Sequence, residues 1–262
     1  MKYRLMVLLA VFLVAACATS PLGRDQLILF PDEQLDQMGL TAWQQIRQDT
    51  PVDDGRQVNR YVSCIAQAIT SQLPGETAGG WEVSVFEQDE VNAFALPGRK
   101  IGVYDGLLNV AENQDQLAAV IAHEVGHVLS QHANERVSTA FAAQTGLQLA
   151  QIAAGAATPA KQQLFGLLGL GAQVGILLPF GRKQETEADL VGLDLMAKAG
   201  FDPRASVALW KNMAKAGGAR PPEFLSTHPS GERRIDDLNA RMSHATQLYE
   251  QARAQGRSPN CG

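Results

Sequence analysis

The sequence predicts an α+β fold that is mostly α-helical, with a small β-sheet beside a central helix. Apolar residues recur at helical spacing over residues 31–48, 52–73, 182–199 and 202–213. Apolar and polar residues instead alternate over residues 81–86, as they do in a half-buried strand. A helical region, a short group of strands and then further helices is the order that indicates an α+β fold.

Glycine and proline delimit the strands. Residues 92–96 form a second extended piece, which Pro97-Gly98 breaks, and residues 100–104 are expected to be its hairpin partner. A long helix is expected next, over residues 114–143, and a last charged helix over residues 231–254. The sheet of about three strands should therefore lie directly before the long helix.

Residues 141–180 are rich in alanine, glycine and leucine. Their most apolar part, residues 165–180, contains four glycines as well as Pro179. That part is too short and too rich in helix breakers for a membrane-spanning helix. We expect either a buried helical hairpin or a mobile cover over the active site.

The stretch His123-Glu124-Val125-Gly126-His127 of the long helix contains the pattern H-E-x-x-H. Four residues turn an α-helix by about 400°, so the two histidines project from one face roughly 6 Å apart. Both can then reach one Zn²⁺ at about 2.0–2.1 Å, and Glu124 is close enough to take a proton from zinc-bound water. The alternative is a buried helix that carries two histidines by chance. Gly126 costs a helix about 1 kcal/mol relative to alanine, which suggests that packing requires a small residue there.

A catalytic zinc site keeps three protein ligands and one open position, so the two histidines need a further ligand. Glu185 and Asp189 lie four residues apart on one face of the helix predicted over residues 182–199. A glutamate ligand followed one turn later by an acid makes chemical sense, because the second acid can orient a zinc-bound histidine through its free N–H.

The composition is that of one globular domain. The chain has 262 residues, of which 45% are hydrophobic and 19% are charged. Its formal net charge of −5 gives no reason to expect a nucleic acid or an anionic membrane surface as a partner.

The N-terminus is expected to be a targeting segment. Lys2 and Arg4 precede an apolar run over residues 6–16, which is too short to span a bilayer permanently. The run ends in Leu-Val-Ala-Ala-Cys at residues 13–17, which resembles a bacterial lipoprotein cleavage box. The resemblance implies a signal peptide over residues 1–16, acylation of Cys17 and, because Ala18 follows, outer-membrane sorting. An ordinary secretory signal is the alternative.

The remaining cysteines form an even pair. If Cys17 carries lipid, Cys64 and Cys261 are left in an oxidising compartment. We expect them to form a disulfide that ties the C-terminal tail to an early helix. Residues 17–30 would then be a lipid-anchored tether, and residues 31–262 the domain that carries the zinc motif.

Four blocks of the sequence resemble a known family. They are residues 92–98 (Asn-Ala-Phe-Ala-Leu-Pro-Gly), the motif from His123 to His127, residues 182–189, and Thr227-His228-Pro229. Together they resemble the zinc metallopeptidase family that includes the bacterial heat-shock protease HtpX, the CAAX prenyl-protein endopeptidases and the mitochondrial Oma-type proteases. The chain is most similar to the periplasmic lipoprotein branch, over about residues 30–250.

The resemblance implies a gluzincin-like domain that holds one Zn²⁺. It maps Glu185 as the third ligand and Asp189 as its supporting acid. Glu187, which lies about 200° around the helix from Glu185, is the alternative third ligand. The histidine that corresponds to His228 lies near the zinc, where it stabilises the oxyanion or fills the open position of a resting form. Alternatively, His228 is only a residue at a helix entry.

The same resemblance implies that Asn92 and Ala93 belong to an edge strand that pairs with the substrate backbone. An ordinary strand is the alternative. His132, about 140° away from the two ligands on a continuous helix, is expected to be structural, and His244 to lie on the surface.

The expected function is that of a zinc endopeptidase on the periplasmic face of the outer membrane of a Gram-negative bacterium. In this role the protein would degrade misfolded or misassembled envelope proteins, with Glu124 as the proton carrier. The alternative is a chaperone-like factor with a latent protease site that helps the outer-membrane assembly machinery. A purely structural zinc site fits poorly, because such sites usually have four protein ligands, often cysteines.

Overall fold

The computed structural model describes residues 17–153, 180–216, 223–229 and 233–262. The expected signal peptide (1–16) and most of the expected hairpin or cover (141–180) therefore lie outside the described residues. None of the described helices is long and apolar enough to cross a membrane. The helices are α2 (Asp32–Asp49), α3 (Arg56–Thr70), α4 (Asp105–Leu108), α5 (Gln114–Leu129), α6 (His132–Ala153), α9 (Arg182–Lys198), α10 (Ala205–Ala216), α11 (Glu223–Thr227) and α12 (Arg234–Ala254), with a 3₁₀ turn, η1, at Gly75–Ala78.

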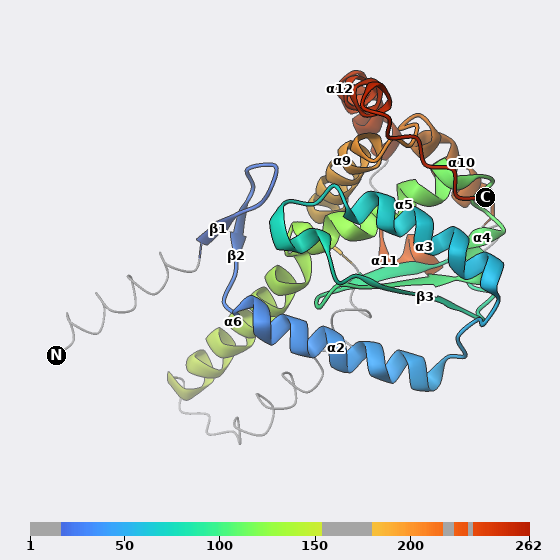
Figure 1. Ribbon diagram of the computed structural model, residues 1–262. Coiled ribbons are helices and arrows are strands. Elements are labelled where there is room, and N and C mark those ends of the chain that lie inside the picture. Colours follow the sequence, from blue (N-terminus) through green and yellow to red (C-terminus); the bar gives the residue numbers. More distant parts are fainter. Residues whose placement is uncertain (1–16, 154–179, 217–222, 230–232) are drawn as a thin grey trace.

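A three-stranded sheet lies at the centre of the molecule, in the order β3 (Glu82–Phe86), β5 (Lys100–Tyr104) and β4 (Ala93–Leu96). β4 and β5 pair antiparallel, which confirms the predicted hairpin, whereas β3 and β5 pair parallel. β4 is therefore an edge strand of this sheet. Helix α2 covers one face and helices α3 and α5 cover the other (Figure 1).

The alternation of side chains along the strands separates two hydrophobic clusters. Phe86 and Phe94 face α2, where both pack against Trp43. Val85 and Ile101 face the opposite way, into the larger core formed with α3 and α5. The period-two pattern of the sequence thus fixes which face of the sheet meets which helix.

Helix α5 is the buried core helix, and it packs against α9 through glycine on both sides. A Cβ atom added to Gly126 would lie 2.9 Å from the backbone oxygen of Ala188, and one added to Gly192 would lie 2.8 Å from the backbone nitrogen of His123. The close packing of α5 on α9 therefore explains the glycine inside the H-E-x-x-H motif.

The single helix predicted over residues 114–143 is wrong, because the chain breaks between α5 and α6. Ser130 ends α5 and Gln131 adopts a left-handed conformation with φ of 51°. Neither residue is a glycine or a proline, so the local sequence carries no strong signal for a break. As a result His132 does not lie where a continuous helix would place it.

Residues 17–30, expected to be a tether, are ordered against the domain. β1 (Cys17–Thr19) and β2 (Asp25–Leu27) form an antiparallel hairpin beside α6 (Figure 1). The backbone N–H of Leu29 donates to Oγ of Ser138 on α6, at 2.9 Å. The chain is therefore fixed to the domain within twelve residues of Cys17.

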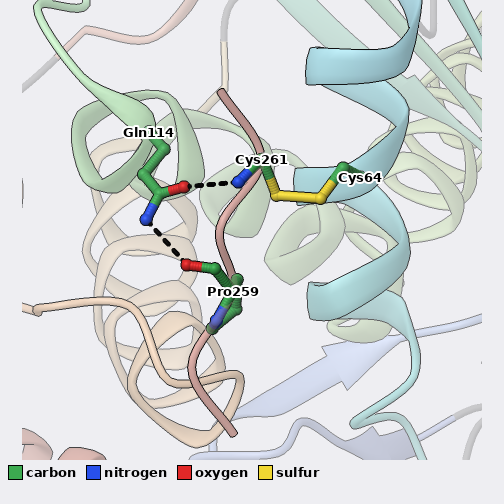
Figure 2. Close-up of a disulfide and its surroundings, with 4 residues drawn as sticks. All are labelled: Cys64, Gln114, Pro259 and Cys261. Atoms are coloured by element: carbon green, nitrogen blue, oxygen red, sulfur yellow. Dashed lines mark hydrogen bonds between the residues drawn. A yellow bond between two sulfur atoms is a disulfide. The ribbon is translucent and has the colours of Figure 1, made fainter.

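The C-terminal tail is tied to α3, as the cysteine count predicts. Cys64 and Cys261 form a disulfide whose Cα atoms are 5.6 Å apart (Figure 2). Gln114, at the start of α5, adds two contacts: its side chain accepts from the N–H of Cys261 at 3.0 Å and donates to the carbonyl of Pro259 at 2.9 Å. The tail thus links α3 to the beginning of the motif helix.

Candidate metal centre

Three helical elements bring the predicted site residues together. His123, Glu124 and His127 lie on α5, Glu185 lies on α9, and His228 directly follows α11. All five side chains are buried. Burial of this many ionisable groups in one place is costly unless they neutralise one another or bind a cation.

Four of these residues turn their donor atoms toward one point. The group is His123, His127, Glu185 and His228, whose donor atoms all lie within 4.8 Å of one another. Nε2 of His123 lies 3.0 Å from Nε2 of His127 and 3.4 Å from Oε2 of Glu185. Nδ1 of His228 lies 3.3 Å from Nε2 of His123 and 3.2 Å from Oε1 of Glu185.

These separations fit a tetrahedral zinc site. Ligand atoms that bind one zinc ion tetrahedrally at about 2.0–2.1 Å lie about 3.3–3.4 Å from one another. Three imidazole nitrogens and a carboxylate oxygen that face one point also have more lone pairs than protons to share, and a divalent cation satisfies that excess. The donor set therefore fits one Zn²⁺.

Asp189 supports the first histidine, where the sequence placed it. Its Oδ1 lies 2.9 Å from Nδ1 of His123, the ring nitrogen that faces away from the other donors. Burial disfavours a charge on His123, yet Asp189 and Glu185 outweigh that effect and raise the pKa of His123 to about 9. In the metal-free protein this ring therefore holds a proton that a metal ion would displace.

Arg234 is a site residue that the sequence reasoning missed. This buried residue opens α12 and donates to Oδ2 of Asp189 at 2.6 Å and to Oε2 of Glu185 at 2.7 Å, while its guanidinium lies 3.8 Å from the ring of Trp210. Two buried carboxylates on one helix face need a nearby cation, because unpaired buried charges are costly. The sequence, with 22 lysines and arginines, does not say which one supplies it.

Glu124 lies beside the donor group without belonging to it. Its Oε2 accepts a hydrogen bond from the backbone N–H of Ala95 at 3.3 Å, and its Oε1 lies 3.5 Å from Nε2 of His228. Burial raises the pKa of Glu124 above its ordinary value, against the opposing influence of His228 and His123. A raised pKa suits a carboxylate that must both take up and release a proton near neutral pH.

His228 fills the fourth position of the donor group. Its ring stacks on Phe224, with centroids 4.2 Å apart and planes 14° apart, and lies 5.1 Å from the ring of Phe180 on another side. Its backbone N–H donates to the carbonyl of Phe224 at 2.8 Å. The stacking fixes the ring in an orientation in which one nitrogen meets the donor group and the other faces Glu124.

Of the two residues predicted to bind substrate, Ala93 begins the edge strand β4 and Asn92 directly precedes it. The carbonyl of Asn92 accepts from the N–H of Tyr104, so its backbone pairs inside the sheet. Ala93 and Ala95 alternate with it, and Ala95 directs its N–H to Glu124. The outward-facing backbone groups of β4 are therefore those of Ala93 and Ala95, whose N–H groups already donate to Oδ1 of Asn92 at 2.9 Å and to Glu124, respectively.

The other predicted residues lie as follows. Glu187 stays outside the donor group and faces the N-terminal hairpin, in the direction that its helical angle predicted. His132 is fully buried, and Nδ1 of its ring lies 2.9 Å from Nδ1 of His127. Burial lowers the pKa of His132 to about 4, although Glu187 opposes the shift. His244 lies on the surface, where 49% of its side chain is exposed.

A cavity of about 310 Å³ continues the site beyond His127. Its walls come from α2, from η1 and the residue before β3, from the turn that ends β4, and from the junction of α5 and α6. They include Leu35, Trp81, Pro97, Leu129 and Ala133. Ala95 contacts Glu124, and Pro97, which lines the cavity, lies two residues further along the chain. The cavity is therefore roughly 7 Å from the point where β4 meets Glu124.

Comparison with known proteins agrees with this geometry. The family model described as "Peptidase family M48" matches residues 54–242. The chain is 38% identical over 187 residues to "Mitochondrial metalloendopeptidase OMA1" of Schizosaccharomyces pombe, which covers 71% of this chain and 53% of that protein. It is 26% identical over 223 residues to "Beta-barrel assembly-enhancing protease" of Escherichia coli (strain K12), covering 82% of this chain and 45% of that protein. The chain spans about half the length of the curated relatives it matches.

Proposed function

This chain belongs to peptidase family M48, and we propose from that membership that it is a zinc-dependent endopeptidase of the bacterial cell envelope. In this role it degrades misfolded or misassembled outer-membrane and periplasmic proteins. The observation that carries the proposal is the donor group itself: three imidazoles and a carboxylate at the separations of a tetrahedral zinc site, with the Glu124 carboxylate beside them.

His123, His127 and Glu185 are the residues that hold the zinc during catalysis. When bound, zinc acts as a Lewis acid that polarises a carbonyl and makes water more acidic. Glu124 accepts the proton of the attacking water and returns it to the leaving amine, which its raised pKa favours. Asp189 keeps the proton of His123 on Nδ1, so that Nε2 keeps its lone pair for the metal.

The substrate binds as an added strand on the free edge of β4. Ala93 and Ala95 offer their outward-facing backbone carbonyls for this pairing, next to Glu124. We place the peptide antiparallel to β4, as β5 is. Its N-terminal part then lies at the C-terminal end of β4, so the residues that precede the scissile bond pass over the cavity. The mainly apolar walls favour a large apolar side chain there, and such side chains are exposed in unfolded proteins.

His228 keeps the resting enzyme latent. With its Nδ1 in the donor group, the site has four protein donors and no open position for a substrate carbonyl. Release of α11 from the site would withdraw the imidazole and open the fourth position. Of the two roles expected for His228, the geometry favours this one over stabilisation of the oxyanion.

We infer the location from the N-terminal sequence. We propose that residues 1–16 are removed and that Cys17 is acylated, which places the domain at the periplasmic face of the outer membrane. Incorporation of labelled palmitate into the wild-type protein, and its loss in Cys17→Ser, tests this anchor. Equal labelling of both proteins would contradict it.

The test of the enzymatic proposal uses purified protein and an unfolded substrate such as casein. We expect cleavage that a zinc chelator abolishes and that stoichiometric zinc restores. Cleavage that survives complete metal removal would refute the proposal.

A second candidate function is chaperone-like help in outer-membrane protein assembly. The closed donor group favours it, because a protein that is latent at rest spends most of its time without proteolysis. The similarity to a protein named for enhancing β-barrel assembly points the same way. Rescue of an envelope defect by Glu124→Gln would favour assembly as the main role, and failure of that rescue would favour proteolysis.

A further inference from the structure

The N-terminal hairpin contacts the metal centre through a buried carboxylate that the proposed mechanism does not use. That carboxylate is Glu187, whose side chain is 4% exposed. Three hairpin groups donate to it: the Ser20 hydroxyl, the backbone N–H of Leu22 at 3.3 Å and Nε of Arg24 at 2.9 Å. These groups, which come from a segment more than 160 residues earlier in the chain, therefore hold this glutamate from one side.

The other side of Glu187 faces a metal ligand through one intervening ring. Nε2 of His132 lies 3.1 Å from Oε2 of Glu187, and Nδ1 of His132 lies 2.9 Å from Nδ1 of His127. A zinc ligand keeps its metal-facing nitrogen unprotonated, so His127 carries its proton on Nδ1 and donates it to His132. His132 then carries its own proton on Nε2 and donates it to Glu187.

This arrangement gives the second zinc histidine the same kind of support as the first. Asp189 contacts His123 directly, at 2.9 Å. No carboxylate contacts Nδ1 of His127 among the described residues, and His132 with Glu187 takes that place. The break after α5 is what allows this, because it turns His132 back toward the ring of His127.

The hairpin is fixed firmly enough to hold Glu187 in place. Arg24 also pairs with Glu135 on α6, where its Nη2 donates to Oε2 at 2.7 Å. Gln26 donates to the carbonyl of Ser130 at 2.7 Å, in the turn between α5 and α6. The hairpin thus contacts both elements that support His127 through His132 and Glu187: the turn that orients His132 and the helix that carries Glu187.

We propose that Glu187 and His132 are positioning residues for the zinc ligand His127, and that the N-terminal hairpin holds Glu187 through Arg24. The segment directly after Cys17 is then part of the metal centre rather than a passive tether. This inference rests on the proposed zinc site.

The decisive variant is Glu187→Gln, because all four hydrogen-bond donors around Glu187 need an acceptor. A glutamine of the same shape offers one oxygen and one NH₂ group, so its NH₂ group must face Arg24 and His132 or the Ser20 and Leu22 donors. Loss of a group that orients a metal-binding histidine typically costs 10–100-fold in metal affinity. We expect Glu187→Gln to weaken zinc binding by that factor, and Arg24→Gln to weaken it by about tenfold.

Zinc affinity of the full-length protein is measured by competition with a chromophoric chelator, and the Co²⁺-substituted proteins are compared by visible absorption. Arg241→Gln is the matched control, because Arg241 also pairs with a carboxylate on α9, Asp194, at 2.6 Å, but has no link to His127. We expect altered Co²⁺ spectra for Glu187→Gln and Arg24→Gln and an unchanged spectrum for Arg241→Gln.

Unchanged zinc affinity and Co²⁺ spectra in a folded Glu187→Gln protein would overturn the inference, even if its melting temperature fell. An Arg241→Gln protein as impaired as Arg24→Gln would do the same. If Glu187→Gln does not fold, Arg24→Gln decides. A wild-type protein that binds no zinc would instead refute the proposed function.

Discussion

Removal of His228 tests whether the donor group is closed at rest. In His228→Ala the fourth donor is lost, while His123, His127 and Glu185 keep their positions on α5 and α9. Structural zinc sites with four protein ligands bind with about 10–16 kcal/mol, or roughly 2.5–4 kcal/mol for each donor. The variant should therefore bind zinc roughly 10²–10³-fold more weakly.

The free energy that His228 contributes to zinc binding also sets the expected gain in activity. A closing contact of roughly 3 kcal/mol limits the open form to about one molecule in a hundred, so removing it should raise the initial rate of casein cleavage by about 100-fold at saturating zinc. The assay follows cleavage of labelled casein over a zinc titration. Thr227→Ala, one residue earlier in the same segment, serves as the control. A rate for His228→Ala at saturating zinc that is equal to or below that of wild type would refute latency and indicate an oxyanion role.

Three further predictions concern pH, specificity and the disulfide. In the metal-free protein, the pKa of His123 is about 9, compared with about 6.5 in the unfolded chain. The protonated His123 therefore adds at most about 3 kcal/mol to the free energy of unfolding, a contribution that is complete below pH 6.5 and lost as the pH rises through 9. Urea unfolding of the metal-free protein should accordingly show lower stability at pH 9 than at pH 6.5. Ala133→Leu, which narrows the cavity, should lower kcat/KM several-fold for peptides with an aromatic residue before the scissile bond and leave peptides with alanine there unchanged; equal loss for both would contradict the cavity assignment. Cys261→Ser should lower the free energy of unfolding by about 2–5 kcal/mol and the melting temperature by roughly 5–15 °C, measured by calorimetry; an unchanged melting temperature would show that the disulfide adds no stability.

The fold was predictable where the pattern of side chains determines it. Alternation over residues 81–86 and the Pro97-Gly98 turn led to the right strands, because Val83 and Val85 face the larger core while Glu82 and Ser84 point to the other side of the sheet. Burial of α5 followed from its almost continuous apolar sequence. The motif spacing also predicted where His123 and His127 lie relative to each other, since local helix geometry alone sets that distance.

The sequence failed where long-range contacts decide the local conformation. Gln131 takes a left-handed conformation that its residue type does not favour, and the hairpin contacts to Ser130 and Glu135 explain why the chain turns there. The assumption of a continuous helix therefore misplaced His132. Residues 17–30 looked like a tether, because Arg24 and Gln26 become structural only through partners more than 100 residues away.

Arg234 and Glu187 show the same limit within the metal centre. Helical angles correctly separated Glu187 from Glu185, but they did not show what Glu187 meets on its own side of α9. Nor does any local pattern tie Arg234, on α12, to Glu185 and Asp189 on α9. Ligands four residues apart are predictable from sequence, whereas the groups that orient them come from other elements.

The most direct test of the central claim is the zinc content and activity of Glu124→Gln. Glu124 lies beside the donor group but contributes no donor atom to it, so the variant should bind one zinc ion per chain with nearly wild-type affinity. Without a carboxylate to carry the proton, its cleavage of casein should fall to background. A Glu124→Gln protein that holds zinc and cleaves casein at the wild-type rate would contradict the account.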